Sequence, residues 1–255
     1  TDLMAVNKAY VDGLSTPYDK VIRTQAEFNA LIASETWLGA ESVALVGQFT
    51  YSEANNSGIK VPATVKQIHG FNGAKITVTN FKYDVNTAKG GLWYDIRPTT
   101  LDYSIRDLEV DCTGTGSSRG FADCTNLTNC AGTGTGTGAA GYGFSNCTIL
   151  TNCTGTGTGT IGYGLASCTN LTNCTGTGTG TAGGFGFAGC TNLANCTGTG
   201  TGTIEGYGFY NITTASNCRD GGVSSTAMWG GTNTNIDLDT CCMTPVEADN
   251  TELNT

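Results

Sequence analysis

The chain has 255 residues, including 38 Gly and 12 Cys, with only 13% charged residues and a formal net charge of −9 at pH 7. In an average globular protein about a quarter of the residues are charged. A composition so poor in charge and so rich in Gly and Cys indicates a repetitive chain. The negative charge argues against nucleic acid or anionic membranes as main partners, and no apolar run reaches the roughly 18 residues of a membrane span, so we expect no membrane insertion.

A short helix is predicted near the beginning of the chain. Thr24 can cap it, and Glu27 follows three residues later, which is the pattern of a capping box. A helix in this place can cover the open end of a stacked β-fold, and we expect it to do so here. The apolar residues that fall near one face of the helix are Ala26, Phe28, Leu31 and Ile32.

Residues 42–111 contain short runs that are apolar or alternate apolar and polar residues, separated by turn signals. We interpret these runs as strands of irregular early coils. They are Ser42–Thr50, Ile59–Ile68, Ala74–Phe81, Leu92–Thr99 and Tyr103–Val110.

An internal repeat then runs from Cys112 to Cys218, and its copies align in four columns. The first two columns are Phe121, Phe144, Leu165, Phe187, Phe209 and Cys124, Cys147, Cys168, Cys190, Ile212. The other two are Leu127, Leu150, Leu171, Leu193, Ala215 and Cys112, Cys130, Cys153, Cys174, Cys196, Cys218. The steps down the last column are 18, 23, 21, 22 and 22 residues, the length of one coil of a parallel β-solenoid.

The segment "GYGFSNCTILTNC" (Gly141–Cys153) with its Gly-rich turns resembles the repeats of right-handed parallel β-helix proteins of the pectin-lyase type. The resemblance covers roughly residues 20 to 240. In addition, "NKAYVDGL" (Asn7–Leu14) resembles a short element near the N-terminus of some bacteriophage tail-fibre proteins. The resemblance implies an elongated, often trimeric fibre or spike that meets a cell-surface glycan.

The predicted fold is therefore all-β, a single-stranded right-handed parallel β-helix of about eight to ten coils with an N-terminal capping α-helix. We divide the chain into an N-terminal attachment or oligomerisation segment (1–23), the capping helix and entry loop (24–41), irregular early coils (42–111), regular coils (112–240) and a C-terminal tail (241–255).

The cysteines of the repeat are spaced Cys-x5-Cys, unlike the Cys-x2-Cys of zinc sites, and the single His69 lies outside the repeat, so we expect no metal and no cofactor. We interpret the Cys columns as buried free thiols that pack as small hydrophobes. Disulfides between adjacent coils, about 4.8 Å apart, are the alternative that geometry allows. The adjacent Cys241 and Cys242 support neither interpretation.

Asn-x-Ser/Thr triplets such as Asn126–Thr128 match glycosylation acceptors. Their regular recurrence favours another interpretation, in which Asn makes the turns and stacks into hydrogen-bonded ladders.

The Thr-Gly runs are the main candidate binding surface. A continuous strand from Cys153 would place Gly155, Gly157 and Gly159 on the same side as Ile161, with the threonines facing outward. Pliable Gly-rich loops are the alternative. The ordered lattice resembles the Thr faces of β-solenoid ice-binding proteins. The residues of this surface are Thr154, Thr156, Thr158, Thr175, Thr177, Thr179, Thr197, Thr199 and Thr201.

A column of Tyr142, Tyr163 and Tyr207 is the candidate for carbohydrate contact, with a packed aromatic stack as the alternative because Phe185 occupies the corresponding place. From Cys124 through Ile204 there is no Asp, Glu, Lys, Arg or His, so the repeats lack the two carboxylates that glycoside hydrolysis usually needs. Any catalytic site would depend on the early coils, where the candidates are Asp102, Asp107 and Asp111.

These observations favour a non-enzymatic structural or adhesive fibre subunit, extracellular or virion-associated. Its uncharged Thr, Gly and Asn surface would contact a sister subunit in a homo-oligomer (a trimer or a filament) or a cell-surface glycan or receptor. Two alternatives stay open: an ice-binding β-solenoid, and a polysaccharide-degrading β-helix enzyme with acidic residues in the early coils.

Overall fold

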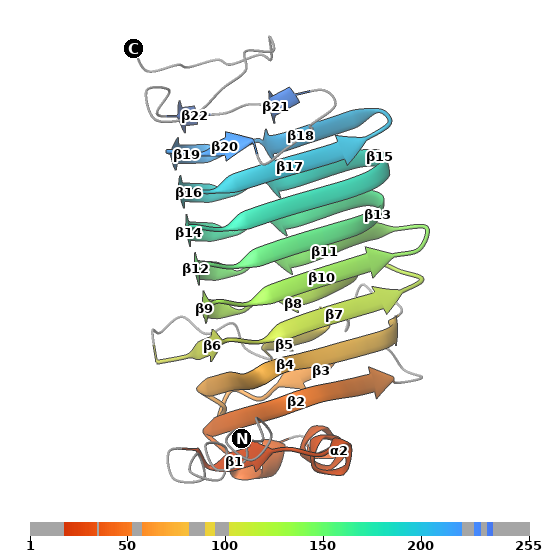
Figure 1. Cartoon of the computed structure of the whole chain (residues 1–255), viewed down its shortest axis with the longest axis vertical. Helices are drawn as coiled ribbons and strands as arrows, with labels where there is room; N and C mark the ends of the chain where they lie inside the picture. Colours follow the sequence, from red (N-terminus) through yellow and green to blue (C-terminus); the bar gives the residue numbers. More distant parts are fainter. Residues whose placement is uncertain are drawn as a thin grey trace, which may run out of the picture.

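The strands of the described chain pair in parallel with those of neighbouring coils, and the coils stack into one rod (Figure 1). The computed structural model describes residues 18–34, 36–52, 58–81, 90–94, 102–220, 227–230 and 234–236. They form an all-β, right-handed parallel β-helix of about eight turns with very little helix, which confirms the predicted fold class. Predicted features that lie outside the described residues are Asn7–Leu14, residues 95–99 of the fourth early run, Cys241, Cys242 and the tail 241–255.

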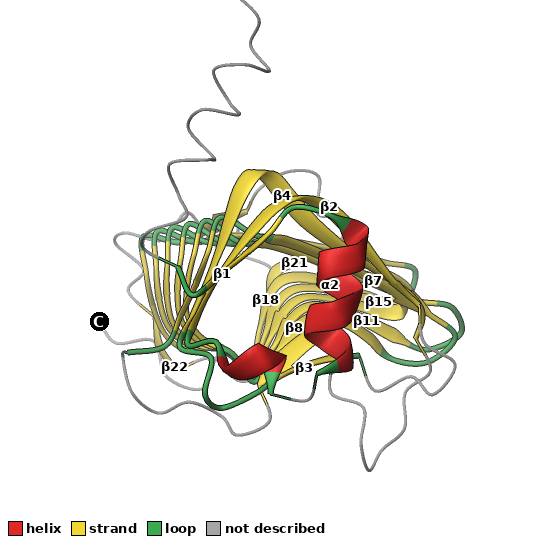
Figure 2. Ribbon diagram, turned by 90° about the horizontal axis from the view of Figure 1, so that it is seen from below, coloured by secondary structure: helices red, strands yellow, loops and turns green. Residues whose placement is uncertain are grey.

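The strands line three faces of the rod, which Figure 2 shows end-on. The threonine face comprises the second halves of β2 (Ser42–Ser52) and β4 (Gln67–Phe81), then β7 (Glu109–Gly114), β10 (Ala131–Gly136), the first halves of β13 (Thr154–Ala166) and β15 (Thr175–Ala188), β17 (Thr197–Gly202) and β20 (Arg219–Asp220). The aromatic face comprises β3 (Ile59–Val61), β5 (Leu92–Tyr94), β8 (Ser118–Ala122), β11 (Ala140–Ser145), the second halves of β13 and β15, β18 (Glu205–Tyr210) and β21 (Ala227–Gly230).

The third face, the leucine face, completes each regular coil. It comprises β1 (Lys20–Ile22), the first halves of β2 and β4, β6 (Ser104–Arg106), β9 (Thr125–Thr128), β12 (Thr148–Thr151), β14 (Thr169–Thr172), β16 (Thr191–Ala194), β19 (Thr213–Ser216) and β22 (Thr234–Ile236).

The predicted helix is α2 (Gln25–Ala33), which lies across the N-terminal end of the rod (Figure 2). Its capping box is formed as predicted, because Thr24 Oγ1 accepts from the Glu27 amide and the Glu27 carboxylate accepts from the Thr24 amide. Phe28 and Leu31 are fully buried, but Ala26 is exposed, so its assignment to the apolar face was wrong. The 3-10 helix η2 (Trp37–Gly39) follows and buries Trp37.

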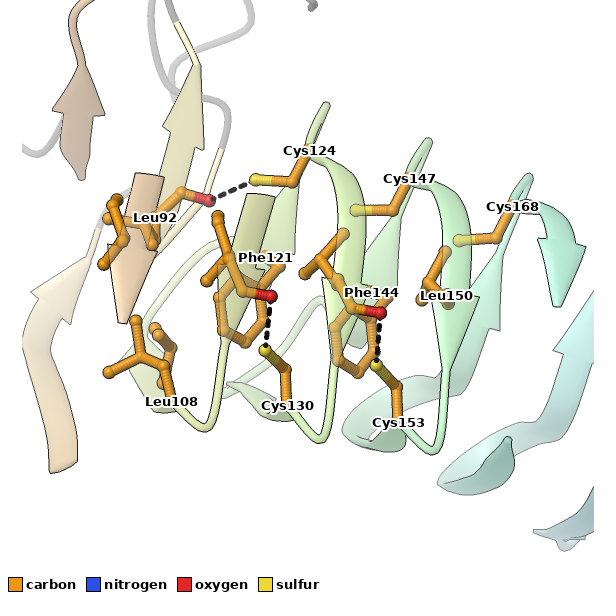
Figure 3. Packing of buried hydrophobic residues seen from close by; sticks show 14 of the residues in the cluster. Leu92, Leu108, Phe121, Cys124, Cys130, Phe144, Cys147, Leu150, Cys153 and Cys168 are labelled. Carbon is orange, nitrogen blue, oxygen red and sulfur yellow. Dashed lines mark hydrogen bonds between the residues drawn. The ribbon is translucent and has the colours of Figure 1, made fainter. Parts of the chain in front are cut away.

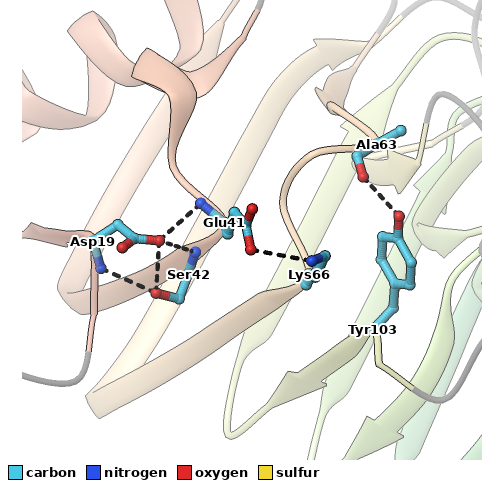
Figure 4. A network of polar contacts seen from close by, with 6 residues as sticks. All are labelled: Asp19, Glu41, Ser42, Ala63, Lys66 and Tyr103. Carbon is cyan, nitrogen blue, oxygen red and sulfur yellow. Dashed lines mark hydrogen bonds and ion pairs between the residues drawn. The ribbon is translucent and has the colours of Figure 1, made fainter.

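Polar contacts fasten the first coils to one another (Figure 4). The Asp19 carboxylate accepts from the backbone amides of Ser42 and Glu41 at 2.8 and 2.9 Å. These hydrogen bonds lower the pKa of Asp19, and the one from the Ser42 amide has the largest effect. The ammonium of Lys66 lies 3.1 Å from a carboxylate oxygen of Glu41, in an exposed pair that adds little stability.

Residues in the left-handed conformation, with φ between +48° and +67°, recur at three places in each regular coil: at both ends of the leucine face and once within its strand. Asn tolerates this conformation better than other residues with a side chain, apart from Asp, which explains the recurring Asn of the sequence. The two corner columns are Asp107, Asn129, Asn152, Asn173, Asn195, Asn217 and Asp123, Asn146, Ser167, Gly189, Asn211. The column within the leucine-face strands is Asn126, Ile149, Asn170, Asn192, Thr214.

Cys, Phe and Leu side chains fill the core between these corners (Figure 3). Strand pairing confirms the Phe121 and Leu127 columns residue by residue, and the ten described cysteines are buried free thiols. One alignment was wrong: Cys112 pairs with Gly134 on the threonine face, and Leu108 precedes Cys130 in the core row (Figure 3). The step of 22 residues from Leu108 replaces the irregular step of 18.

Away from this core, in the coils from Gly132 onward, the threonine and aromatic faces lie back to back with no side chain between them. In the coils before them the same inward columns hold Ile76, Val78, Val110 and Cys112. A Cβ atom at Gly155 would lie 2.4 Å from the carbonyl oxygen of Gly164, and one at Gly157 would lie 2.2 Å from that of Tyr163. Equivalent glycines recur in the coils from Gly132 to Gly208, so this half of the rod is there a thin slab held together by backbone contact. The glycines are required by close approach, despite the backbone entropy that they cost.

We predict that Gly157→Ala destabilises the protein by about 3 kcal/mol or more, because the new methyl group meets backbone on both sides. Urea denaturation measures the loss. Thr156→Ala, one residue away and facing outward, is the matched control and should change stability far less. Equal small effects of the two substitutions would contradict the close contact.

The buried thiols should resist modification. Burial raises the pKa of Cys112 to about 12 and also raises that of Cys124 and Cys168. We therefore expect iodoacetamide at pH 8 to alkylate the ten described cysteines only after unfolding, as intact and peptide mass spectrometry would show. Rapid labelling of any of them in the folded protein would contradict their burial.

Candidate functional site

The nine threonines predicted as a binding surface all lie on the threonine face, in three columns that run along the rod. In the first column Thr154 pairs with Thr175, and Thr175 pairs with Thr197. The columns that begin at Thr156 and Thr158 pair in the same way, two and four residues further along each strand. Neighbours are thus about 4.8 Å apart between coils and about 7 Å along a strand. Thr133 and Thr135 extend two columns by one coil, and the hydroxyls of Thr135 and Thr158 are 3.1 Å apart.

The Thr-Gly runs are therefore ordered strands, and the loop alternative does not hold for them. The prediction that one continuous strand places Ile161 on the same side as Gly155, Gly157 and Gly159 was, however, wrong. The register shifts between Gly159 and Ile161, and the chain turns back so that Tyr163 packs against Gly157. Ile161 consequently lies on the aromatic face and not beside Cys153.

The Tyr column forms a ladder of stacked rings on the aromatic face. The centroids of Tyr142 and Tyr163 are 4.8 Å apart and those of Tyr163 and Phe185 are 5.1 Å apart, with interplanar angles of 7° and 14°. Tyr207 continues the stack at 5.9 Å from Phe185. Because each ring covers the face of the next, the side chains offer mainly their edges and hydroxyls to a ligand.

An amide ladder runs along one corner of the rod. Asn217, Asn195, Asn173 and Asn152 each donate from Nδ2 to Oδ1 of the preceding Asn, at 2.5 to 3.2 Å. The last amide, that of Asn129, donates to Asp107 at 2.9 Å. A second, shorter ladder joins Asn192 to Asn170. The recurring Asn thus has the stacking role that we expected.

At the base of that ladder, Asp107 joins a chain of polar groups. Its Oδ2 is 2.9 Å from His69 Nε2, and His69 Nδ1 is 2.5 Å from the Tyr18 hydroxyl. Burial lowers the pKa of His69, while Asp107 acts in the opposite direction. A neutral imidazole between a hydroxyl and a carboxylate can exchange a proton with either neighbour.

The structure does not bring the three candidate catalytic aspartates together. Asp111 lies on the threonine face and contacts the ammonium of Lys75, which also lies 2.8 Å from Glu109. Asp102 is exposed near Lys66. Asp107 and Glu109 line a shallow groove of about 380 Å³. Among the described residues no three His, Cys, Asp or Glu side chains are grouped to hold a metal ion, and no described helix is long and apolar enough to cross a membrane.

No family model matches the chain, and no curated protein sequence matches it. Among solved structures, the A-module of a mannuronan C-5 epimerase from Azotobacter vinelandii is similar at 11% identity and a TM-score of 0.30, over 88% of this chain and 70% of that chain. A likeness of this size does not indicate what this chain binds or converts.

The pKa of the single histidine is open to direct measurement. Since burial lowers the pKa of His69 below its ordinary 6.5, the stability tied to its neutral form is full above pH 6.5 and is lost as the pH falls through the folded pKa. We expect an NMR titration of the imidazole Cε1 proton to give a value below 6.5. A pKa above 6.5 would show that Asp107 outweighs burial.

Proposed function

We propose that the chain is a non-enzymatic fibre or filament subunit whose threonine face binds a neutral partner, either a second copy of the chain or an uncharged glycan. The observation that carries the proposal is the strict register of the threonine columns on a face without charge between Thr133 and Thr201. A flat, ordered surface of this kind loses little conformational entropy on contact and imposes no charge repulsion.

The surroundings of the acidic residues support a non-enzymatic role. Hydrolysis of a glycan needs an acid and a base that face one bond. Asp107 and Asp111 are instead engaged with His69 and Lys75. Asp111 does converge with Glu109, but both carboxylates contact the ammonium of Lys75, which favours their charged forms and leaves neither as a proton donor.

A fibre subunit of this type works outside the cell or on a virion. Such places are oxidising, and free thiols are uncommon there. The ten described thiols are compatible with them because they are buried, most of them bonded to backbone carbonyls, as Cys153 is to Thr151 at 3.4 Å.

Ice binding is the second candidate function, favoured by the spacing of the same columns. A two-dimensional lattice of hydroxyl and methyl groups about 4.8 by 7 Å can order water in a repeating pattern. The partner would then be a crystal face of ice.

We predict that Thr177→Lys, at the centre of the threonine face, weakens self-association or glycan binding at least tenfold, because the interface would have to bury an unpaired charge. Light scattering at high protein concentration and an array of neutral glycans measure the two forms of binding. Thr172→Lys, exposed on the leucine face of the same coil, is the matched control.

If the wild-type protein is a clean monomer that binds no glycan, or if Thr177→Lys leaves its binding unchanged, the fibre proposal fails. Shaping of ice crystals at micromolar concentration, lost in Thr177→Tyr, would establish the second candidate instead.

A further inference from the structure

The repeat changes its residue types at one place on the aromatic face. The column that holds Ala140 and Ile161 continues with Gly183 and then Glu205. A second column on this face holds the small residues Ala122, Ser145, Ala166 and Ala188 and then Tyr210. Since the preceding regular coils stack with apolar residues or a serine in these columns, packing alone does not require a carboxylate or a phenol here.

These changes surround a pocket of about 230 Å³. Gly183 lets the ring of Phe185 lie directly against the backbone, because a Cβ at this position would be 2.9 Å from Cε2 of that ring. Phe185, which is only 5% exposed, forms the floor of the pocket. Ile161 and Tyr163 wall the pocket from the preceding coil. Ile204, which is 77% exposed, and Tyr210 wall it from the following coil.

Tyr210 does not simply lengthen the aromatic ladder. Its ring centroid is 5.0 Å from that of Phe185, but the two rings are tilted by 58°. It is therefore turned out of the stack and stands as a separate wall beside the floor, where an apolar ligand group can contact it.

The charge of the pocket comes from Glu205, which is exposed at its rim and is the single charged residue between Asp123 and Arg219. A carboxylate beside apolar walls complements a group with an aliphatic body and a positive end. The stack of aromatic rings that begins at Tyr142 already contacts a cation at that end. The Arg119 guanidinium carbon lies 5.1 Å from the Tyr142 ring centroid.

We propose that this pocket binds a primary ammonium group, carried either by an amino sugar or by a lysine side chain. The alkyl or sugar carbons would lie on Phe185 and Tyr210, and the ammonium would pair with Glu205. The site lies on the face opposite the threonine columns, so it does not rest on the function proposed for them.

The test is an NMR titration of the ¹⁵N-labelled full chain with three probes: methyl glucosaminide, its neutral N-acetyl counterpart and Nα-acetyl-lysine methylamide. We expect the two ammonium compounds to give saturable shifts at Ile161, Gly183, Glu205 and Tyr210, and the N-acetyl compound to give none. The ammonium compound that saturates at the lower concentration identifies the source of the group.

Two variants test the residues. Glu205→Gln should weaken binding about fivefold and Tyr210→Ala about tenfold, and both residues lie in columns that accept small side chains, so the fold should survive. Glu41→Gln, at the other end of the rod, removes the same charge and should leave binding unchanged. Equal binding of the N-acetyl compound, no saturable shifts, or equal effects of Glu205→Gln and Glu41→Gln would overturn the proposal.

Discussion

Direct contact between the backbones of two sheets is the constraint on which the rest of this structure depends. In the coils from Gly132 onward, where the threonine and aromatic faces meet, every inward position must lack a side chain, and the outward positions carry all of the chemistry. The alternation of Gly with Thr on one strand, and of Gly with an aromatic residue on the returning strand, follows from that requirement. In these coils the hydrophobic core is confined to the other half, where Cys, Phe and Leu fill the space between the Asn corners.

The same constraint explains why the two outer surfaces differ. Short β-branched threonines form a flat lattice, whereas the larger rings of the opposite face stack on one another and leave room for a pocket where the column is interrupted at Gly183. Both surfaces are almost uncharged over the regular coils, so a single carboxylate such as Glu205 has a strong local effect. The two proposed binding surfaces are therefore separate parts of one thin slab.

Much of the fold could be predicted from the sequence, because a solenoid repeats each contact at a fixed spacing. The columns of Phe121 and Leu127 are correct for that reason. Cys112 was wrongly placed in the Cys130 column because it is a cysteine like the other members of that column. The spacing favours Leu108, which precedes Cys130 by the usual 22 residues. The reversal between Gly159 and Ile161 could not be predicted, since the alternation of the sequence continues through it and only the contact of Gly157 with Tyr163 decides it. Glu205 and Tyr210 are visible departures from the repeat, but their meeting around Gly183 needs the stacked coils.

The most direct measurement of the central claim is a search for nuclear Overhauser effects between α-protons of the two faces. Backbone contact predicts cross-peaks between Gly155 and Gly164 and between Gly157 and Tyr163, and their equivalents in the coils from Gly132 onward, since no side chain separates the strands there. If these cross-peaks are absent and the Thr-Gly amides exchange with solvent as quickly as those of an open loop, the two faces do not touch and the account is contradicted.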